Sequence, residues 1–502
     1  MKSKHWSIII PGAVLLSATP ASAIDLRQAV QSALTTNPQI HQAIANRVAT
    51  QEERVQAEGL YYPRISVEAS GGVRDLRNPT RRSLGIASHV LNPLEADLIV
   101  DQLVFDSGGR EAEIRRQAAR TDAAAARVEE RSEFVALNVS RAYIDYLLQE
   151  RLVAIAQDNV AFHEKLAADL REGVSKGSIS IADEQQAEER LQAARAKVTQ
   201  AREDLDTAAI EFQAIAGIPI DSASMPPDLS QALPANVNDA QYQARESNPL
   251  VQEALADLSA ARENITAAKA KLGPRFSIEA RARAGHDIDG FEGRTTDLQA
   301  LGVVRWDIFT GGINQANVRE QQGRADEAHG RLFEQTRQAE QDARSAWSRL
   351  TNQTALTTEL ETQSRISDDL LLSYREQFNV GRRSLLDVLD AQNSRYNVQA
   401  QVETARLAKL YAQYRVLAAT NKLVDALGVK IATAGYGGER ARYRVNPIPP
   451  ADLMENNLSA PPMGPPVPVG GTPAGATPGE TITNPTGTPD QTTPPPAETP
   501  GR

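Results

Sequence analysis

Asp387 and Asp390 are spaced so that their carboxylates could act together, because side chains three positions apart lie on one face of a helix. Two neighbouring carboxyl groups can serve as a general acid and a general base. Acidic residues are also favoured in the first turn of a helix, where the helix dipole stabilises negative charge. We prefer this helix-start role to catalysis, and we expect the protein not to be an enzyme.

The residue types that bind metals are scarce in this chain. It has six histidines and no cysteine. No histidines show the spacing that would place two metal ligands on one helix face. His163 and His329 stand alone on predicted helices, and we interpret them as ordinary surface or wall residues. We therefore expect no metal, no cofactor, no disulfide and no lipid anchor on cysteine.

The beginning of the chain has the pattern of a secretory signal peptide. Lys2 and Lys4 precede an apolar stretch at residues 8–16, and small residues at 21–23 form a cleavage site. The sequence thus predicts a signal peptide over residues 1–23 and a mature protein outside the cytoplasm. The formal net charge of −10 is spread over interspersed acids and bases, which argues against nucleic acid as a partner.

After residue 23, charged residues interrupt every apolar stretch. None reaches the roughly 20 apolar residues of a transmembrane helix. If the mature protein lies in a membrane, it must form a closed β-barrel, because lipid cannot satisfy an open sheet edge.

The sequence contains an internal duplication. Asn37-Pro38 recurs as Asn248-Pro249, and residues 63–68 recur as 274–279, in both cases 211 positions later. Residues 177–183 recur only 204 positions later, as 381–387, so the first copy has a longer loop, which we place within residues 78–95. We interpret residues 24–235 and 236–430 as two structural repeats, each with a helix, two strands, a long helix and a further helix.

The predicted helices are of two lengths. Residues 109–175 and 312–378 lack proline and are long enough to span roughly 100 Å each. The shorter segments 26–60 and 179–217, stacked end to end, would match one long helix. We therefore predict that each repeat forms an antiparallel coiled coil. One side is the long helix, and the other is the two shorter helices stacked end to end. Asp106 and Thr310, before paired glycines, are expected to cap the long helices.

Four segments alternate with the period of a strand: residues 65–73, 96–105, 278–285 and 297–308. Ile278, Ala280 and Ala282 alternate with charged residues at 279, 281 and 283. A barrel wall between lipid and a wet lumen needs this pattern. A soluble sheet with one solvated face gives the same pattern, so the strands alone leave both alternatives open. Residues 96–105 alternate least cleanly.

Together these features resemble the TolC family of outer-membrane factors. The resemblance rests on the signal peptide, the duplicated layout, the Asn-Pro steps, the Phe-Asp-Ser-Gly-Gly of residues 105–109 and the motif VGRRSLLDVLDAQ at residues 380–392. It covers about residues 24–428. The residues of the last motif are more similar to the type I secretion branch than to the lipidated multidrug branch. The lack of a cysteine for lipidation agrees with this.

The resemblance implies a mainly α fold with β: a homotrimer in which four strands per protomer build one 12-stranded transmembrane β-barrel, continued by a helical coiled-coil tunnel. It places the protein in outer-membrane lipid of a Gram-negative bacterium, with the tunnel extending into the periplasm. The implied partners are a periplasmic adaptor (membrane fusion) protein and an inner-membrane ABC transporter or other pump, which would pass proteins to the outside. A small-molecule efflux duct and a periplasmic coiled-coil scaffold are the alternatives, although a scaffold has no use for alternating strands.

The resemblance also implies a gate at the end of the helices farthest from the barrel. It assigns Arg383 to an ion pair with Asp183 that holds the inner helix pair shut. Asp387 and Asp390 would form a ring of charges in the trimer that favours cations. The family's tyrosine is replaced here by Phe378, so a hydroxyl-mediated link at that position is lost.

The turns between each long helix and the next helix are the expected tip of the tunnel. Gly177, Gly381 and Arg382 lie in these turns and would contact the adaptor. Residues 431–502 form a separate tail, in which proline, glycine and threonine dominate from residue 447 onward. Such a composition cannot bury a core, so we expect the tail to be disordered.

Overall fold

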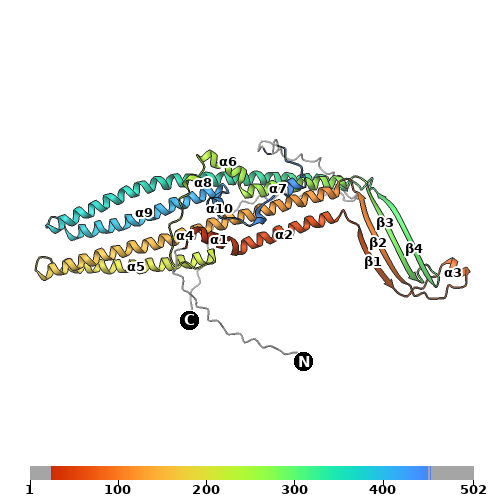
Figure 1. Ribbon diagram of the computed structural model, residues 1–502, viewed down its shortest axis with the longest axis horizontal. Helices are drawn as coiled ribbons and strands as arrows, with labels where there is room; N and C mark the ends of the chain where they lie inside the picture. The colour runs from red at the N-terminus through yellow and green to blue at the C-terminus, as the bar shows by residue number, and fades with distance from the viewer. Residues whose placement is uncertain (1–23, 450–452, 454–502) are drawn as a thin grey trace, which may run out of the picture. The chain divides into compact units, whose positions relative to one another are not determined.

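The computed structural model describes residues 24–449 and residue 453. The predicted signal peptide and most of the predicted tail lie outside these residues. The main elements, in chain order, are α1 (Leu26–Thr36), α2 (Pro38–Gly59), β1 (Arg64–Gly71), α3 (Pro79–Ser83), β2 (Leu94–Phe105), α4 (Gly109–Ser175), α5 (Ile181–Ala216), α6 (Val237–Ser247), α7 (Pro249–Ala270), β3 (Arg275–His286), β4 (Arg294–Arg305), α8 (Ile313–Asn379), α9 (Leu385–Ala419), α10 (Leu423–Ala426) and α11 (Glu439–Arg442). The fold is the expected one of long antiparallel helices and a four-stranded sheet (Figure 1).

The order of elements repeats along the chain. Two helices, two strands, a 67-residue helix and a further helix follow one another from α1 to α5, and again from α6 to α9; the first repeat has in addition the short α3 between its strands. The segment predicted as one bent helix over 26–60 is two helices, because Asn37 caps α2 by accepting a hydrogen bond from the N–H of Gln39 at 2.9 Å. Asn248 caps α7 in the same way, and each is followed by a proline at the first helical position.

The long helices begin at left-handed glycines. Gly108 and Gly312 occupy the N-cap positions of α4 and α8, with φ of 91° and 86°. The Asp106 carboxylate accepts from the N–H of Arg110 at 2.7 Å, and the Thr310 hydroxyl accepts from the N–H of Asn314 at 3.4 Å. The predicted capping side chains thus act from two positions before the N-cap.

Helix α4 lies between other helices over its whole length, with α2 and α5 on one side and α7 and α9 on the other (Figure 1). The largest apolar cluster forms around the middle of α4. Tyr143, Phe212 of α5 and Tyr414 of α9 are fully buried there. The Tyr143 hydroxyl lies 2.6 Å from the carbonyl oxygen of Ile24, which fixes the start of the described chain on this core.

The four strands form one antiparallel sheet in chain order. Residues that pair across the four strands form rows that are alternately apolar and charged. One apolar row consists of Val67, Leu98, Ala282 and Leu298, and the next row is charged and consists of Glu68, Asp97, Arg283 and Asp297. The predicted apolar and charged faces are therefore correct, and β2 is a full 12-residue strand. The prediction that β4 reaches residue 308 was wrong. β4 ends at Arg305, which pairs with Arg275, and the preceding Pro274 has no N–H to extend the ladder.

The apolar face of the sheet is uncovered in the single chain. Leu298 is 84% exposed and Val67 is 71% exposed. A soluble protein rarely exposes such a continuous apolar surface. Among the helices of the described residues, none is both long enough and apolar enough to cross a membrane.

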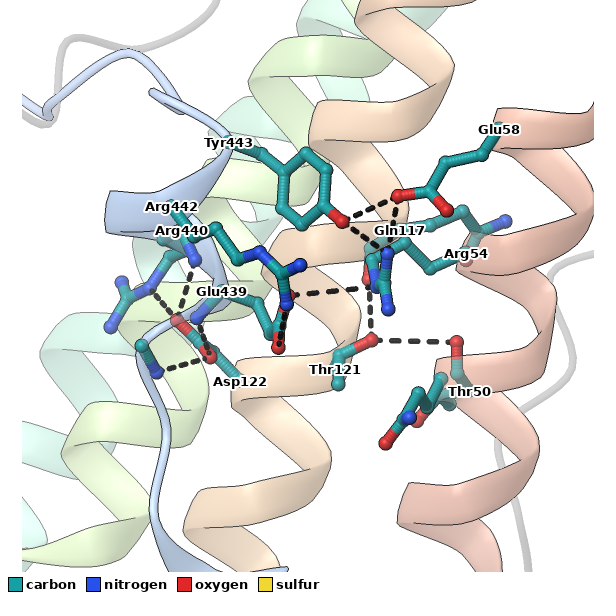
Figure 2. A network of polar contacts seen from close by, with 12 residues as sticks. Thr50, Arg54, Glu58, Gln117, Thr121, Asp122, Glu439, Arg440, Arg442 and Tyr443 are labelled. Carbon is teal, nitrogen blue, oxygen red and sulfur yellow. Dashed lines mark hydrogen bonds and ion pairs between the residues drawn. The ribbon is translucent and has the colours of Figure 1, made fainter.

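Residues 431–449, which we call the C-terminal strap, correct the predicted start of the disordered tail. They contain α11 and pack on α4 and α2 (Figure 2). Asp122 of α4 accepts hydrogen bonds from the N–H groups of Gly438, Glu439 and Arg440 at 2.8–3.0 Å. The strap is ordered because specific polar groups bind it, which composition alone does not reveal.

Candidate functional site

The turns that join α4 to α5 and α8 to α9 lie at the end of the helices away from the sheet (Figure 1). They have the same backbone geometry. Gly177 and Gly381 adopt left-handed conformations, with φ of 72° and 75°. Their N–H groups donate to the carbonyls of Val174 and Phe378, both at 2.9 Å, which is the hydrogen bonding of a helix end closed by glycine.

Each turn leads into a helix that is capped by a serine and an aspartate. The Ser180 hydroxyl donates to Asp183 at 2.8 Å, and the N–H of Asp183 donates back at 3.1 Å. Ser384 and Asp387 make the same pair of bonds and a third, from the N–H of Ser384 to Asp387. These bonds from Ser384, helped by nearby Arg383, lower the pKa of Asp387. Asp183 and Asp387 thus have a definite structural role in starting α5 and α9.

Arg383 is held within its own turn. Its guanidinium lies 4.2 Å from the centre of the Tyr374 ring, donates to the amide oxygen of Gln377 at 3.1 Å and lies 3.7 Å from Asp387. The ion pair with Asp183 implied by the family resemblance is not among the contacts of the described residues. The physical reason is that each aspartate is already bound by its capping serine, and Arg383 stacks on the helix that it follows.

The two helical hairpins, α4 with α5 and α8 with α9, contact each other next to these turns. We call this contact the hairpin junction. Leu385 and Leu389 of α9 pack among Leu166 and Leu170 of α4. Phe378, where the family has tyrosine, is partly buried against the same cluster. The hydroxyl-free ring therefore contributes apolar packing between the hairpins.

A polar bond crosses the same hairpin junction. The Gln392 side chain donates to the Asn159 side chain at 2.8 Å, and both residues are buried. Sequence reasoning missed this pair, although a polar residue within an apolar helix seam is a detectable signal. A single buried polar pair fixes the register of two helices, because sliding would leave both groups unsatisfied.

His163 and Asp390 line a small hollow at this junction, of about 120 Å³, together with Lys197. Of the two interpretations of His163, the surface position was wrong, because the residue is only 6% exposed. Its burial, followed by the positive charges of Arg190 and Lys197, lowers its pKa. Asp390, by contrast, is exposed on the first turns of α9 and is free of the capping bonds that hold Asp387.

The tip therefore combines rigid turns, exposed charges and a hairpin junction with one buried polar pair. Among the described residues, no group of three or more His, Asp or Glu side chains is placed to hold a metal ion. Gly177, Gly381 and Arg382 are exposed at the turns, as an adaptor contact would require.

The two long helices differ in how well the single chain covers them. Helix α4 has 29 buried residues, whereas α8, of equal length, has 10. Ile366 and Leu372 of α8 are 62% and 60% exposed. In the chain order of the sheet, β1 and β4 likewise have one free edge each. The chain thus has two lateral surfaces. One is formed by α8 and β4, and the other by β1, α2 and α5.

Comparison with known proteins gives the family. The sequence model described as "Outer membrane efflux protein" matches residues 29–218 and 240–429, which is more than half of the chain and one match per repeat. The chain is 26% identical to the outer membrane efflux protein BepC of Brucella suis, over 84% of this chain and 92% of that protein. It is 24% identical to the proteases secretion protein PrtF of Dickeya chrysanthemi, over 82% and 90% of the two chains.

The fold has a counterpart among solved structures. The CmeC outer membrane channel of Campylobacter jejuni superposes with a TM-score of 0.69 at 14% identity, covering 89% of this chain and 98% of that one. At this identity the likeness concerns the fold, and it includes both the helices and the sheet.

Proposed function

The chain belongs to the TolC-like family of outer membrane efflux proteins, and we propose that it acts as a homotrimeric duct for type I protein secretion. It is an outer-membrane protein of a Gram-negative bacterium that extends into the periplasm, and it serves as the channel of a tripartite export system. The proposed partners are a periplasmic adaptor protein and an inner-membrane ABC transporter. The proposal gives the chain no catalytic role.

The proposal of a trimer rests on the uncovered surface at α8 and β4. Within one chain, β2 pairs with β3 where the first repeat meets the second. The same kind of junction can form between chains, with β4 of one copy beside β1 of the next. A closed ring of three copies would remove every free strand edge and would cover α8 with α2 and α5 of the neighbour.

The duplication predicts the register of this contact. Val100 of β2 pairs with Ala280 of β3. The equivalent residues in the other repeat are Val304 of β4 and Ala69 of β1. Because the chain has no cysteine, Val304→Cys combined with Ala69→Cys creates the only thiols. Oxidation should link the double variant into covalent trimers in outer membranes.

Two comparisons make this experiment decisive. Each single variant should stay monomeric on denaturing gels, because it lacks the second thiol. Val303→Cys with Ala69→Cys should link less, because adjacent residues of a strand point to opposite faces. A double variant that assembles in outer membranes but gives no covalent trimer would rule out this strand register.

The proposal also specifies the class of exported cargo, which is protein. Type I secretion is supported by the 380–392 motif and by the similarity to PrtF, a proteases secretion protein. The similarity to BepC, an efflux protein, favours small-molecule efflux as the second candidate. Deletion of the gene should remove at least one protein from the culture medium, and the intact gene should restore it. Unchanged secreted proteins together with increased sensitivity to toxic compounds would favour the second candidate.

A further inference from the structure

The apolar face of the sheet ends in a pair of basic residues. His286 of β3 and Arg294 of β4 lie directly opposite each other and are the last pair of these two strands. They belong to the apolar face, because His286 follows Ala282 by four residues and Arg294 precedes Leu298 by four. This end of the sheet lies beside α3, away from the long helices (Figure 1). Since the helices extend into the periplasm, the pair lies at the cell-surface end of the sheet.

The position of the pair matches the edge of the apolar layer of a membrane. Arg294 and Val304 lie on the same face ten positions apart, which is roughly 34 Å along a strand and roughly 25 Å at the tilt of barrel strands. The lipid-facing band of an outer-membrane barrel is about 25 Å tall. At the other end of the band, Trp306 and Tyr62 are exposed, as expected of an aromatic belt. His286 and Arg294 therefore lie at the height of the outer-leaflet headgroups.

This height alone does not require basic residues. The same row contains Gly71 of β1 and Leu94 of β2. When the ring of His286 is protonated, two positive charges lie directly opposite each other, which destabilises a sheet unless an anion lies between them. The basic pair is thus specific to the second repeat, and its chemistry indicates an anion.

The acids of the neighbouring loop are engaged elsewhere. Asp289 lies 3.8 Å from Arg283, which belongs to the charged face of the sheet, and Glu292 lies 3.2 Å from His89. Arg294 is exposed and has no ion pair with an acid among the described residues. Its guanidinium is therefore available to an external anion.

His286 can offer a second donor beside Arg294. Its Nδ1 lies 2.8 Å from the carboxylate of Asp287, and its side chain is 61% exposed. Asp287 is itself buried, and it accepts a hydrogen bond from the N–H of Gly293 at 2.9 Å, which fixes the carboxylate. An imidazolium bound to a carboxylate through Nδ1 has a second N–H, on Nε2, that can donate to an anion.

We propose that His286 and Arg294 bind the phosphate of a phosphorylated lipid of the outer leaflet, whose acyl chains lie on the apolar face. Directly opposite residues have Cβ atoms roughly 5 Å apart, so both side chains can reach one phosphate. A guanidinium also matches the geometry of phosphate oxygens. Leu298, which is 84% exposed, continues the apolar surface from the basic pair, and this favours a lipid over a free phosphate ion. The inference rests on the proposed trimeric barrel, which turns this face to the lipid, and not on the cargo.

Native mass spectrometry on the purified trimer tests the proposal, with diphosphoryl lipid A as the probe. Lipid A with the same acyl chains and no phosphate is the matched ligand. We expect one diphosphoryl lipid A per chain, bound at least about tenfold tighter than the dephosphorylated lipid. Equal binding of the two lipids would overturn the proposal. Inorganic phosphate alone should not be retained, and its retention together with a failure to prefer the phosphorylated lipid would identify an ion site only.

Variants locate the site. Arg294→Gln alone should reduce the preference for the phosphorylated lipid, and Arg294→Gln with His286→Gln should abolish it. Both residues are exposed, so these variants should still fold. Arg281→Gln is the matched control, because Arg281 of the same strand as His286 belongs to the charged face. An unchanged preference in the double variant would assign the lipid to another place and refute the proposal.

The outcome is separable from that of the proposed function. The covalent trimer formed by Val304→Cys with Ala69→Cys shows whether the barrel closes as proposed. A linked trimer that does not distinguish the two lipids would refute the lipid site alone. Absence of the trimer would refute the closed barrel, and with it the lipid-facing position of this pair.

Discussion

Arg440 donates to the carboxylate of Asp122 through both its backbone N–H and its guanidinium, at 3.0 and 3.2 Å, although the two residues are 318 positions apart (Figure 2). Asp122 is buried, so these donors replace the water that would otherwise bind its carboxylate. The strap also reaches α2, where the Tyr443 hydroxyl binds Glu58, and α7, where Asn446 donates to Glu263. One segment beyond the two repeats thus holds helices of both repeats together.

Replacing Asp122 with alanine should detach the strap. Several N–H donors would lose a buried anionic acceptor, and hydrogen bonds to charged groups contribute roughly 1.5–3 kcal/mol each to stability. We expect a local loss of about 2–3 kcal/mol, seen as faster hydrogen exchange in residues 431–449 and a lower melting temperature of the assembled protein. Asp145→Ala is the control, because Asp145 of α4 accepts, among the described residues, a single long hydrogen bond from Gln149.

Truncation distinguishes the strap from the rest of the tail. A chain that ends at residue 446 keeps α11 and its bonds to Asp122, so we expect normal assembly. A chain that ends at residue 430 lacks the strap and should melt at least as early as Asp122→Ala. Equal stability of the two truncated chains would contradict the stabilising role of the strap.

The sequence was most informative where a pattern repeats over many residues. The limits predicted for the first long helix, 109–175, are those of α4, because 67 residues of uninterrupted helical pattern leave few alternatives. The two faces of the sheet followed from the alternation of apolar and charged residues, which is clear at residues 278–285. Sequence did not predict the strap or the partners of Arg383, because these depend on a few polar side chains that meet only after folding. The burial of His163 was missed for the same reason, since its neighbours come from two other helices, α5 and α9.

Replacing Arg383 with serine should loosen the tip. The side chain stacks on Tyr374 and lies near Asp387, and both charged groups are more than a third exposed, so water screens their attraction and each copy contributes weakly. We expect a higher single-channel conductance in planar bilayers. Arg383→Lys should have an intermediate effect, because lysine keeps the charge without the planar stacking.

Asp183→Asn decides whether Arg383 acts within its own turn. In the structure Asp183 is bound by Ser180, so this variant should leave the conductance close to that of the native protein. A conductance as high as that of Arg383→Ser would instead support an ion pair between Arg383 and Asp183 in the assembled protein.

Asp387 and Asp390 should respond differently to substitution. Asp390→Ala removes an exposed carboxylate and should weaken the block by multivalent cations applied from the periplasmic side, with little change in stability. Asp387→Ala also removes the acceptor of the Ser384 N–H, which is one half of the capping box, so the start of α9 should fray. Asp183→Ala removes the corresponding carboxylate of the first repeat, which accepts from the Ser180 hydroxyl. If Asp390→Ala leaves the cation block unchanged, the charge ring is not part of the gate.

The buried His163 predicts how the hairpin junction depends on pH. Burial lowers its pKa below the ordinary value of 6.5, so the folded junction favours the neutral ring. Well above pH 6.5 the ring is neutral in both the closed and the exposed state, and its full contribution to stability is present. As the pH falls through 6.5 and then through the lower pKa of the folded state, the exposed ring gains a proton first, and this contribution is lost.

We therefore expect acid to open the junction between the hairpins. Hydrogen exchange of residues 159–167 and 385–393 should accelerate between pH 7.5 and pH 5.5 in the native protein, after correction for the intrinsic exchange rate. His163→Gln cannot take up a proton in this range, so its corrected exchange should change much less. His329→Gln is the control, because His329 lies on α8 and contacts Phe333 instead of the hairpin junction. An equal acid response in His163→Gln and the native protein would assign the pH dependence to the carboxylates of the tip.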